Sequence, residues 1–256
     1  WDKENVLIDK IEYKYNKEAA TVAPELFLRG EIDASAIPTA ILDDWFNDEE
    51  KKDLVRQSSN SFYTYFYALN FDPQFDAEYE PENWKVAVNN KNFRKSLFHG
   101  LDRVSAMMTV EPYNPETLLS NTITPKNFVD VDGVDYTQLD ALAKFSNTDS
   151  FDKDLALEYK EKAMEELAGK ATFPVKVLMP YNSGSPDWAN RSQVIEQQLE
   201  NLLGKDYIDI IVYAGPSTGF VGEVRRPGKY AFMEVNWGPD YADPSSYTDP
   251  FTEGGT

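Results

Sequence analysis

Apolar residues at alternating positions mark the beginning of the chain. Between residues 6 and 16 the apolar positions are Val6, Ile8, Ile11, Tyr13 and Tyr15. This spacing is typical of a strand with one buried face. The apolar spacing becomes helical over residues 21–28 and stops at Gly30, and residues 31–38 predict a short strand that ends at Pro38. The pattern therefore predicts a strand, a helix and a strand in the first 38 residues.

The next hundred residues alternate between periodic and irregular segments. A helix is predicted over residues 39–55, and the many aromatic residues of segment 62–71 indicate a buried strand. Residues 72–92 contain two prolines and several Asn and Asp residues without periodicity, which predicts a long surface loop. One amphipathic helix is predicted next, with Arg94 and Lys95 towards solvent and an apolar stripe of Phe93, Leu97, Leu101, Val104 and Met108. Residues 107–134 are predicted to be irregular.

The last third of the chain has the clearest periodicity. Asp152 is suited to cap a helix, and Gly169 is placed to end it in a left-handed conformation. The stripe of that helix is Leu155, Tyr159, Ala163 and Leu167. Strands are predicted at 175–179 and 207–213 around a helix at 188–203, and another strand at 229–237. Strand, helix and strand with short links indicate an α/β fold with a mixed, mostly parallel sheet flanked by helices.

Composition and charge narrow the possible partners. The chain has 256 residues, of which 44 are acidic and 25 basic, so its net charge is −19. Such a surface repels polyanions, which excludes nucleic acid and anionic membrane surfaces as favourable partners. The absence of cysteine excludes disulfides and thiolate metal sites but leaves the compartment open. The start at Trp1 and the end at Thr256, within an apparent motif, lead us to expect an excised fragment.

The sequence gives only weak support for catalytic or metal-binding residues. Asp102 and Arg103 are adjacent, so on a helix they diverge and cannot form a catalytic pair; structural capping or a lobe contact is the better interpretation. The single histidine, His99, is expected to be a packing residue. The segment around Gly133 resembles a calcium loop but lacks the spacing and the final Glu of an EF-hand, so a solvated turn is expected for Asp130, Asp132 and Asp135. We therefore predict no catalytic residue, no metal site and no cofactor.

Several segments together resemble a known family. Residues 236–247 read NWGPDYADPSSY and resemble a W-x-x-D-Y-x-D-P-x-x-[FY] motif. Residues 92–103, NFRKSLFHGLDR, are similar to a V-R-x-A-x-x-x-A-[IL]-D-R helix, and residues 28–33 contain a weaker G-E-[IL]-D match. Trp1 and Asp2 match the end of an N-x-x-Y-W-D segment. In this order and spacing the segments resemble the family-5 solute-binding proteins of oligopeptide ABC importers, which include streptococcal peptide-binding lipoproteins.

The resemblance implies a fold and a role for the chain. Family members have two lobes of the type II periplasmic-binding-protein kind, and residues 1–256 correspond to the second lobe, so a first lobe would lie outside this chain. The implied function is extracytoplasmic capture of oligopeptides and delivery to an ABC importer. Closure of the lobes about a hinge would signal to the permease subunits. The implied location is the outer face of the cell membrane, with a lipid anchor that is not in this chain.

The resemblance also implies which residues bind the ligand. Asp240 would pair with the free amino terminus of the peptide, because a buried ammonium needs a hydrogen-bonded carboxylate. Trp237 would form an apolar wall, and Asn236, Gly238 and Tyr241 would line the same site. The alternative interpretation is that Asp240 closes a Gly-Pro turn and that Trp237 belongs to the core.

One departure from the family pattern and three alternative functions remain open. Some relatives have a basic residue three positions before the Trp, where it meets a ligand carboxylate, but this chain has Glu234. A fixed ligand length is therefore not expected. The same fold could bind a non-peptide solute such as nickel, haem or a sugar. An acidic surface module that binds another protein, or a hydrolase with paired carboxylates, would be a different class of function.

Overall fold

The structure is a computed structural model that describes residues 4–56 and 62–253. The match at Trp1 and Asp2 lies outside the described residues. The chain divides into two compact units, residues 1–53 and residues 54–256. Each unit is described by itself.

The first unit is helical in the part that the structure describes. It contains α1 (Ala19–Leu28) and α2 (Thr39–Asn47), and a 3-10 turn, η1 (Lys52–Leu54), crosses its boundary. The helix predicted at 21–28 is confirmed, but the helix predicted at 39–55 ends at Asn47. The strands predicted at 6–16 and 31–38 are wrong. Both segments are extended or bent without strand pairing, and the first leaves Leu7 87% and Tyr13 91% exposed. The apolar alternation is present, but no described segment supplies the hydrogen-bonding partner that a strand requires.

The second unit contains the described strands, and these form three pairs. β4 (Val175–Asn182) and β5 (Ile208–Gly215) are parallel and are joined by α8 (Pro186–Leu203), which confirms the predicted parallel strand, helix and strand unit. β1 (Thr64–Leu69) and β6 (Phe232–Trp237) pair antiparallel. β2 (Asp130–Val131) and β3 (Val134–Asp135) form a short antiparallel hairpin. The backbone N–H of Ala231 donates to the carbonyl of Leu178 at 2.8 Å, which joins the start of β6 to β4.

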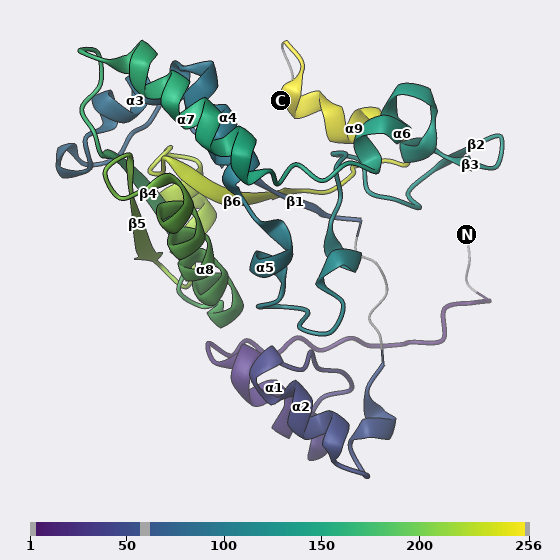
Figure 1. The fold of residues 1–256 in the computed structure, drawn as a ribbon. Coiled ribbons are helices and arrows are strands. Elements are labelled where there is room, and N and C mark those ends of the chain that lie inside the picture. Colours follow the sequence, from purple (N-terminus) through teal and green to yellow (C-terminus); the bar gives the residue numbers. More distant parts are fainter. Residues whose placement is uncertain (1–3, 57–61, 254–256) are drawn as a thin grey trace. The chain divides into compact units, whose positions relative to one another are not determined.

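Helices cover this mixed set of strands and complete the main core. Figure 1 shows α4 (Lys91–Gly100) beside α7 (Lys153–Leu167), and α8 alongside β5. The predicted limits of α7 are confirmed, because the Asp152 side chain accepts from the backbone N–H of Leu155 at 2.9 Å and Gly169 has a φ of 72°. The largest fully buried side chains of the core are Trp84, Tyr207, Phe93, Met179, Ile195, Leu199, Leu203 and Ile208.

Two predictions for residues 72–108 are wrong. The expected surface loop contains η2 (Ala77–Tyr79) and α3 (Pro81–Asn89), and α3 buries Trp84 completely against Phe93. The single expected amphipathic helix is two helices, α4 and α5 (Arg103–Met107). The break falls at Asp102, because its side chain accepts from the backbone N–H of Ser105 at 3.1 Å and so starts a new helix.

The remaining elements are short. The strand predicted at 62–71 is confirmed as β1, although most of it is half-buried and Tyr65 is 61% exposed. The other helices and turns are η3 (Pro115–Leu118), η4 (Tyr136–Gln138), α6 (Asp140–Ser146), a π-helical turn η5 (Val221–Arg225), α9 (Ser245–Thr248) and η6 (Asp249–Phe251). No helix within the described ranges combines the length and apolar character needed to cross a membrane.

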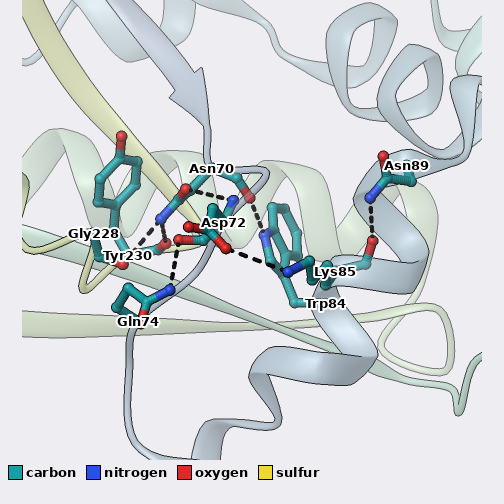
Figure 2. Close-up of polar contacts among 8 residues, drawn as sticks. All are labelled: Asn70, Asp72, Gln74, Trp84, Lys85, Asn89, Gly228 and Tyr230. Carbon is teal, nitrogen blue, oxygen red and sulfur yellow. Dashed lines mark hydrogen bonds and ion pairs between the residues drawn. The ribbon is translucent and has the colours of Figure 1, made fainter.

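The side chain of Asn70 fixes one end of the β1–β6 pair (Figure 2). Its amide nitrogen donates to the carbonyls of Gly228 and Tyr230, each at 2.9 Å, and its amide oxygen accepts from the backbone N–H of Asp72 at 3.0 Å. The carbonyl of Asn70 accepts from the indole N–H of buried Trp84 at 2.7 Å. Asn70 thereby joins the end of β1 to the turn that precedes β6.

Candidate ligand-binding site

The predicted site begins at the other end of the β1–β6 pair. Asn236 and Trp237 are the last two residues of β6, and they pair with Tyr65 and Thr64 of β1. β6 forms because Met233 and Val235 pack into a small apolar cluster on one face while Phe232 reaches the main core on the other. The predicted site therefore begins at the end of a strand whose two faces both pack against apolar residues.

Ser246 folds the chain back after β6. The indole N–H of Trp237 donates to the carbonyl of Ser246 at 2.6 Å, and the hydroxyl of Ser246 accepts from the backbone N–H of Asp240 at 2.8 Å. Ser246 is 2% exposed, so both bonds are shielded from water. The loop of residues 238–246 is thus closed by a buried serine from α9, and its conformation does not depend on the side chain of Asp240.

The carboxylate of Asp240 is free to meet a ligand. The residue is exposed, and within residues 4–56 and 62–253 its side chain has no hydrogen bond or ion pair. It lines neither the cavity beside residues 129–136 nor the cavity beside Tyr213 and Pro216. An exposed carboxylate at the tip of a fixed loop can accept hydrogen bonds from a cation such as an ammonium group.

Gly238 lies against an aromatic ring from the residue that precedes the other strand of the pair. A Cβ atom at this position would lie 2.7 Å from Cε1 of Tyr63, so any side chain would displace the ring. Tyr63 is 54% exposed and immediately precedes β1. The absence of a side chain at Gly238 therefore allows the tyrosine ring to cover the backbone of the loop.

Asn236 and Tyr241 complete the set of predicted site residues. The side chain and the carbonyl of Asn236 accept from the Arg225 guanidinium at 3.5 and 3.4 Å, which are long distances. The hydroxyl of Tyr241 lies 3.3 Å from Oγ of Ser245 and donates to Asp249 at 3.4 Å, while its ring is largely exposed. All five predicted residues thus lie within or just after the end of β6.

Two exposed tyrosines beside this site were not predicted to belong to it. Tyr65 is 61% exposed and is the register partner of Asn236, and Tyr63 covers Gly238. The sequence signal was the aromatic run 62–71, which was assigned to the interior. Alternation within a strand sends successive side chains to opposite faces, so part of such a run can remain on the surface.

Glu234 is enclosed in a buried ion pair. Its carboxylate accepts from Nε and Nη2 of Arg191 on α8 at 2.7 and 2.8 Å, and the Glu234 side chain is 8% exposed. The Tyr67 hydroxyl also donates to it at 3.3 Å, and burial together with the charge of Glu234 raises the pKa of Tyr67. The acidic residue that replaces the family's basic one is therefore neutralised by an arginine from a neighbouring helix.

The other candidate residues have structural contacts. His99 stacks on Tyr159, and its Nδ1 lies 2.8 Å from the carbonyl of Ser150, which confirms the packing interpretation. Arg103 pairs with Asp149 at 2.7 Å, separately from the capping contact of Asp102.

The suspected calcium loop forms the β2–β3 hairpin. In it, Asp135 accepts backbone N–H bonds from Asn127 and Thr137, and Asp132 and Gly133 both have positive φ values. This hairpin confirms the expected turn. Across the described residues there is no group of three or more His, Cys, Asp or Glu side chains that could hold a metal ion.

Comparison with known proteins places these features in a family context. The family model of the bacterial extracellular solute-binding proteins, family 5 Middle, matches residues 1–256. The oligopeptide-binding protein AliA of Streptococcus pneumoniae is 27% identical over 97% of this chain, and the oligopeptide-binding protein SarA of Streptococcus gordonii is 26% identical over 100%. The chain spans only 42% and 43% of the lengths of these two relatives.

Solved structures show the same fold. The substrate-binding domain of an oligopeptide ABC transporter from Bacillus anthracis matches 98% of the chain with a TM-score of 0.71 and 23% identity. OppA of Listeria monocytogenes, solved with a bound peptide, matches 92% with a TM-score of 0.70 and 20% identity. The chain covers 44% and 42% of these two structures. The predicted α/β fold of the periplasmic-binding-protein kind is thereby confirmed.

Proposed function

Because this chain belongs to the bacterial extracellular solute-binding proteins of family 5, we propose that it captures oligopeptides as the second lobe of a two-lobed receptor for an ABC importer. The names of the relatives AliA and SarA, both oligopeptide-binding proteins, support a peptide ligand. The first lobe would come from the remainder of a longer protein, since the chain spans under half of each of these relatives. Closing of the lobes would then signal to the permease subunits.

The observation that carries this proposal is the free carboxylate of Asp240. It stands on a loop that Ser246 closes from behind, so it is held in position without using its own oxygens. A peptide amino terminus enclosed between two lobes loses its water and needs an anionic acceptor. Trp237 and Tyr241 would supply apolar surface to the first side chains, and Asn236 and the backbone at Gly238 would supply polar contacts.

The proposal assigns the protein a binding role and no catalytic step. The family is one of extracellular solute-binding proteins, and we further propose that the complete protein is held at the outer face of the membrane by a lipid anchor. Peptides should therefore be recovered intact after incubation, which mass spectrometry of the ligand can check. Cleavage of the peptide would contradict a pure binding role.

Calorimetry with the complete two-lobed protein tests the role of Asp240. Tetra-alanine with a free amino terminus should bind, and the N-acetylated peptide should bind much more weakly. Asp240→Asn should weaken binding of the peptide with the free amino terminus by about 2 kcal/mol or more, roughly thirty-fold in Kd. The reason is that the ammonium loses its charged partner. The same substitution should change the binding of the acetylated peptide little.

A matched control and two contrary results complete this test. Glu165→Gln removes an exposed carboxylate from α7 and should leave both affinities unchanged. Equal binding of free and acetylated peptide would rule out amine recognition by Asp240. Failure of any peptide to bind, with binding of a sugar, haem or nickel instead, would favour the non-peptide alternative.

A further inference from the structure

A cavity lies next to the loop that carries Asp240. It has a volume of about 440 Å³ and lies between the segment after Tyr241 and the hairpin region 129–136. Figure 1 shows the β2–β3 hairpin and α9 at the same end of the second unit. The residues that line the cavity are Val129, Val131, Tyr136, Ala242, Asp243, Pro244, Ser245 and Thr248.

Most of the cavity wall is apolar and open to solvent. Val131 of β2 and Val129, which immediately precedes β2, both line the cavity, while Asp130 between them does not. Val131 is 44% exposed even though it pairs with Val134, which is 46% exposed. Pro244 contributes to the opposite wall. A slender aliphatic chain between these walls would remove apolar surface from water on both sides.

Asp243 is the only carboxylate in the lining. Its Oδ1 accepts from the backbone N–H of Ser245 at 2.8 Å, and hydrogen bonds from the Ser245 hydroxyl and backbone lower the pKa of the Asp243 carboxyl. The group is therefore ionised at neutral pH, and the lining contains no lysine or arginine to neutralise it. A positively charged group at the end of an aliphatic chain would be attracted here, and an acidic one would be repelled.

The cavity lies close to the proposed peptide site. Asp240 precedes the lining residue Ala242 by two positions, and the hydroxyl of Tyr241 lies 3.3 Å from Oγ of the lining residue Ser245. An extended peptide advances by about 3.3 Å per residue, so a peptide held at Asp240 can present one of its first side chains to the cavity.

We propose that this cavity is a specificity pocket for a lysine or arginine side chain of the bound peptide, with the aliphatic stem between Val131 and Pro244 and the cationic head at Asp243. The inference rests on the proposed peptide-binding function and adds a side-chain preference to it. The pocket would not exclude neutral residues, because its walls accept any aliphatic chain. It would disfavour glutamate and aspartate.

Peptides that differ only in one side chain test the pocket directly. Tetra-alanine is varied at each of its four positions in turn with lysine, norleucine or glutamate, and binding to the complete two-lobed protein is measured by calorimetry. Norleucine has the lysine stem without the amine, so the ratio of the two dissociation constants isolates the charge. One position should favour lysine over norleucine on the order of three- to five-fold, the size of a solvent-accessible ion pair. Glutamate should bind more weakly than norleucine at that position.

Two variants assign this preference to Asp243. Asp243→Asn retains the acceptor for Ser245 and removes the charge, so the lysine to norleucine ratio should fall towards one while norleucine affinity stays the same. Asp130→Asn removes a neighbouring exposed charge that does not line the cavity, so its ratio should match the wild type. Val131→Ser should weaken binding of the lysine and norleucine peptides equally, because it removes apolar surface from the cavity wall and no charge.

The possible results separate the pocket from the underlying function. Binding of all peptides without discrimination at any position would overturn the pocket and leave peptide capture intact. A preference that persists in Asp243→Asn, or that disappears equally in Asp130→Asn, would overturn the role of Asp243. If neither tetra-alanine nor any substituted peptide bound, both the proposed function and the pocket would be rejected.

Discussion

At the scale of single residues, the ion pair between Arg191 and Glu234 neutralises the carboxylate of β6, the strand that leads into the ligand site. Both side chains are less than 10% exposed, and the guanidinium meets the carboxylate through two hydrogen bonds. A buried carboxylate is costly unless it is paired, and here Tyr67 supplies a further donor. Glu234 therefore offers no free charge to a ligand, and Asp240 is the free carboxylate next to β6.

Removing one partner of this pair should lower the stability of the protein more than removing both. Arg191→Met leaves Glu234 buried without its cation, and we expect a loss of about 3–5 kcal/mol in the free energy of unfolding. The double variant Arg191→Met with Glu234→Met should recover most of this loss, because no buried charge remains. Urea unfolding followed by circular dichroism measures both.

An exposed pair provides the control for this prediction. Lys162 and Glu158 form an i, i+4 pair on α7 with half-exposed side chains, so Lys162→Met should cost less than about 1 kcal/mol. If Arg191→Met were no more destabilising than Lys162→Met, the buried pair would have no special role in stability.

Contacts between residues close in sequence could be predicted, and contacts between distant ones could not. The cap of α7 by Asp152 involves a backbone group only three residues away, and the left-handed Gly169 follows the helix directly. Arg191 and Glu234 are separated by 43 positions, and Tyr63 reaches Gly238 across a strand pair. No local pattern encodes which distant residues meet, so these contacts follow only from the assembled fold.

At the scale of elements, the β1–β6 pair depends on its ends because it is a two-stranded ribbon. Two strands alone are marginally stable in water, so side chains must fix their register. Asn70 does this at the end away from the ligand site, where its amide makes three hydrogen bonds to backbone groups. A shift in register would carry Trp237 and the loop after it away from Tyr63, which lies against Gly238.

Replacing Asn70 should therefore weaken both the fold and the site. Asn70→Ala leaves the carbonyls of Gly228 and Tyr230 without this donor, and we expect a loss of about 1–3 kcal/mol in the free energy of unfolding. Hydrogen exchange should also increase along β6. Gln74→Ala is the matched control, because its side chain makes only a 3.5 Å contact to the carbonyl of Asp72 and should cost little. Equal effects of the two substitutions would show that Asn70 does not fix the register.

A sequence pattern predicted a strand correctly where the segment finds a second strand to pair with in the fold. The segment 175–213 was predicted well because each strand finds the other through the helix that connects them. Residues 6–16 have the alternation of a strand but no described partner, so they remain extended and exposed. The helix α3 was missed although Pro81 at its first position and the apolar residues Trp84 and Val88 are compatible with a helix start. Its neighbouring asparagines and prolines favoured a loop.

At the scale of the whole molecule, the chain supplies one side of the site that we propose. Asp240, Trp237 and Tyr241 belong to the second unit, and Asp240 and Tyr241 are exposed. Ligand sites for small molecules usually enclose 70–90% of the ligand surface, which one exposed loop does not achieve. The relatives AliA and SarA are more than twice as long as this chain, which leaves room for a second lobe to provide the rest.

The isolated chain should therefore bind peptides far more weakly than the complete two-lobed protein that we propose. Without an opposing lobe, Asp240 would meet the peptide amine in water, where an exposed ion pair contributes at most about 1 kcal/mol. Most of the apolar contact would also be lost, so we expect Kd to rise by roughly 100-fold or more. Calorimetry of both proteins with tetra-alanine measures the difference, and circular dichroism must first show that the isolated chain is folded. Equal affinity in the two would mean that this chain binds its ligand alone, and lobe closure would then be unnecessary for capture.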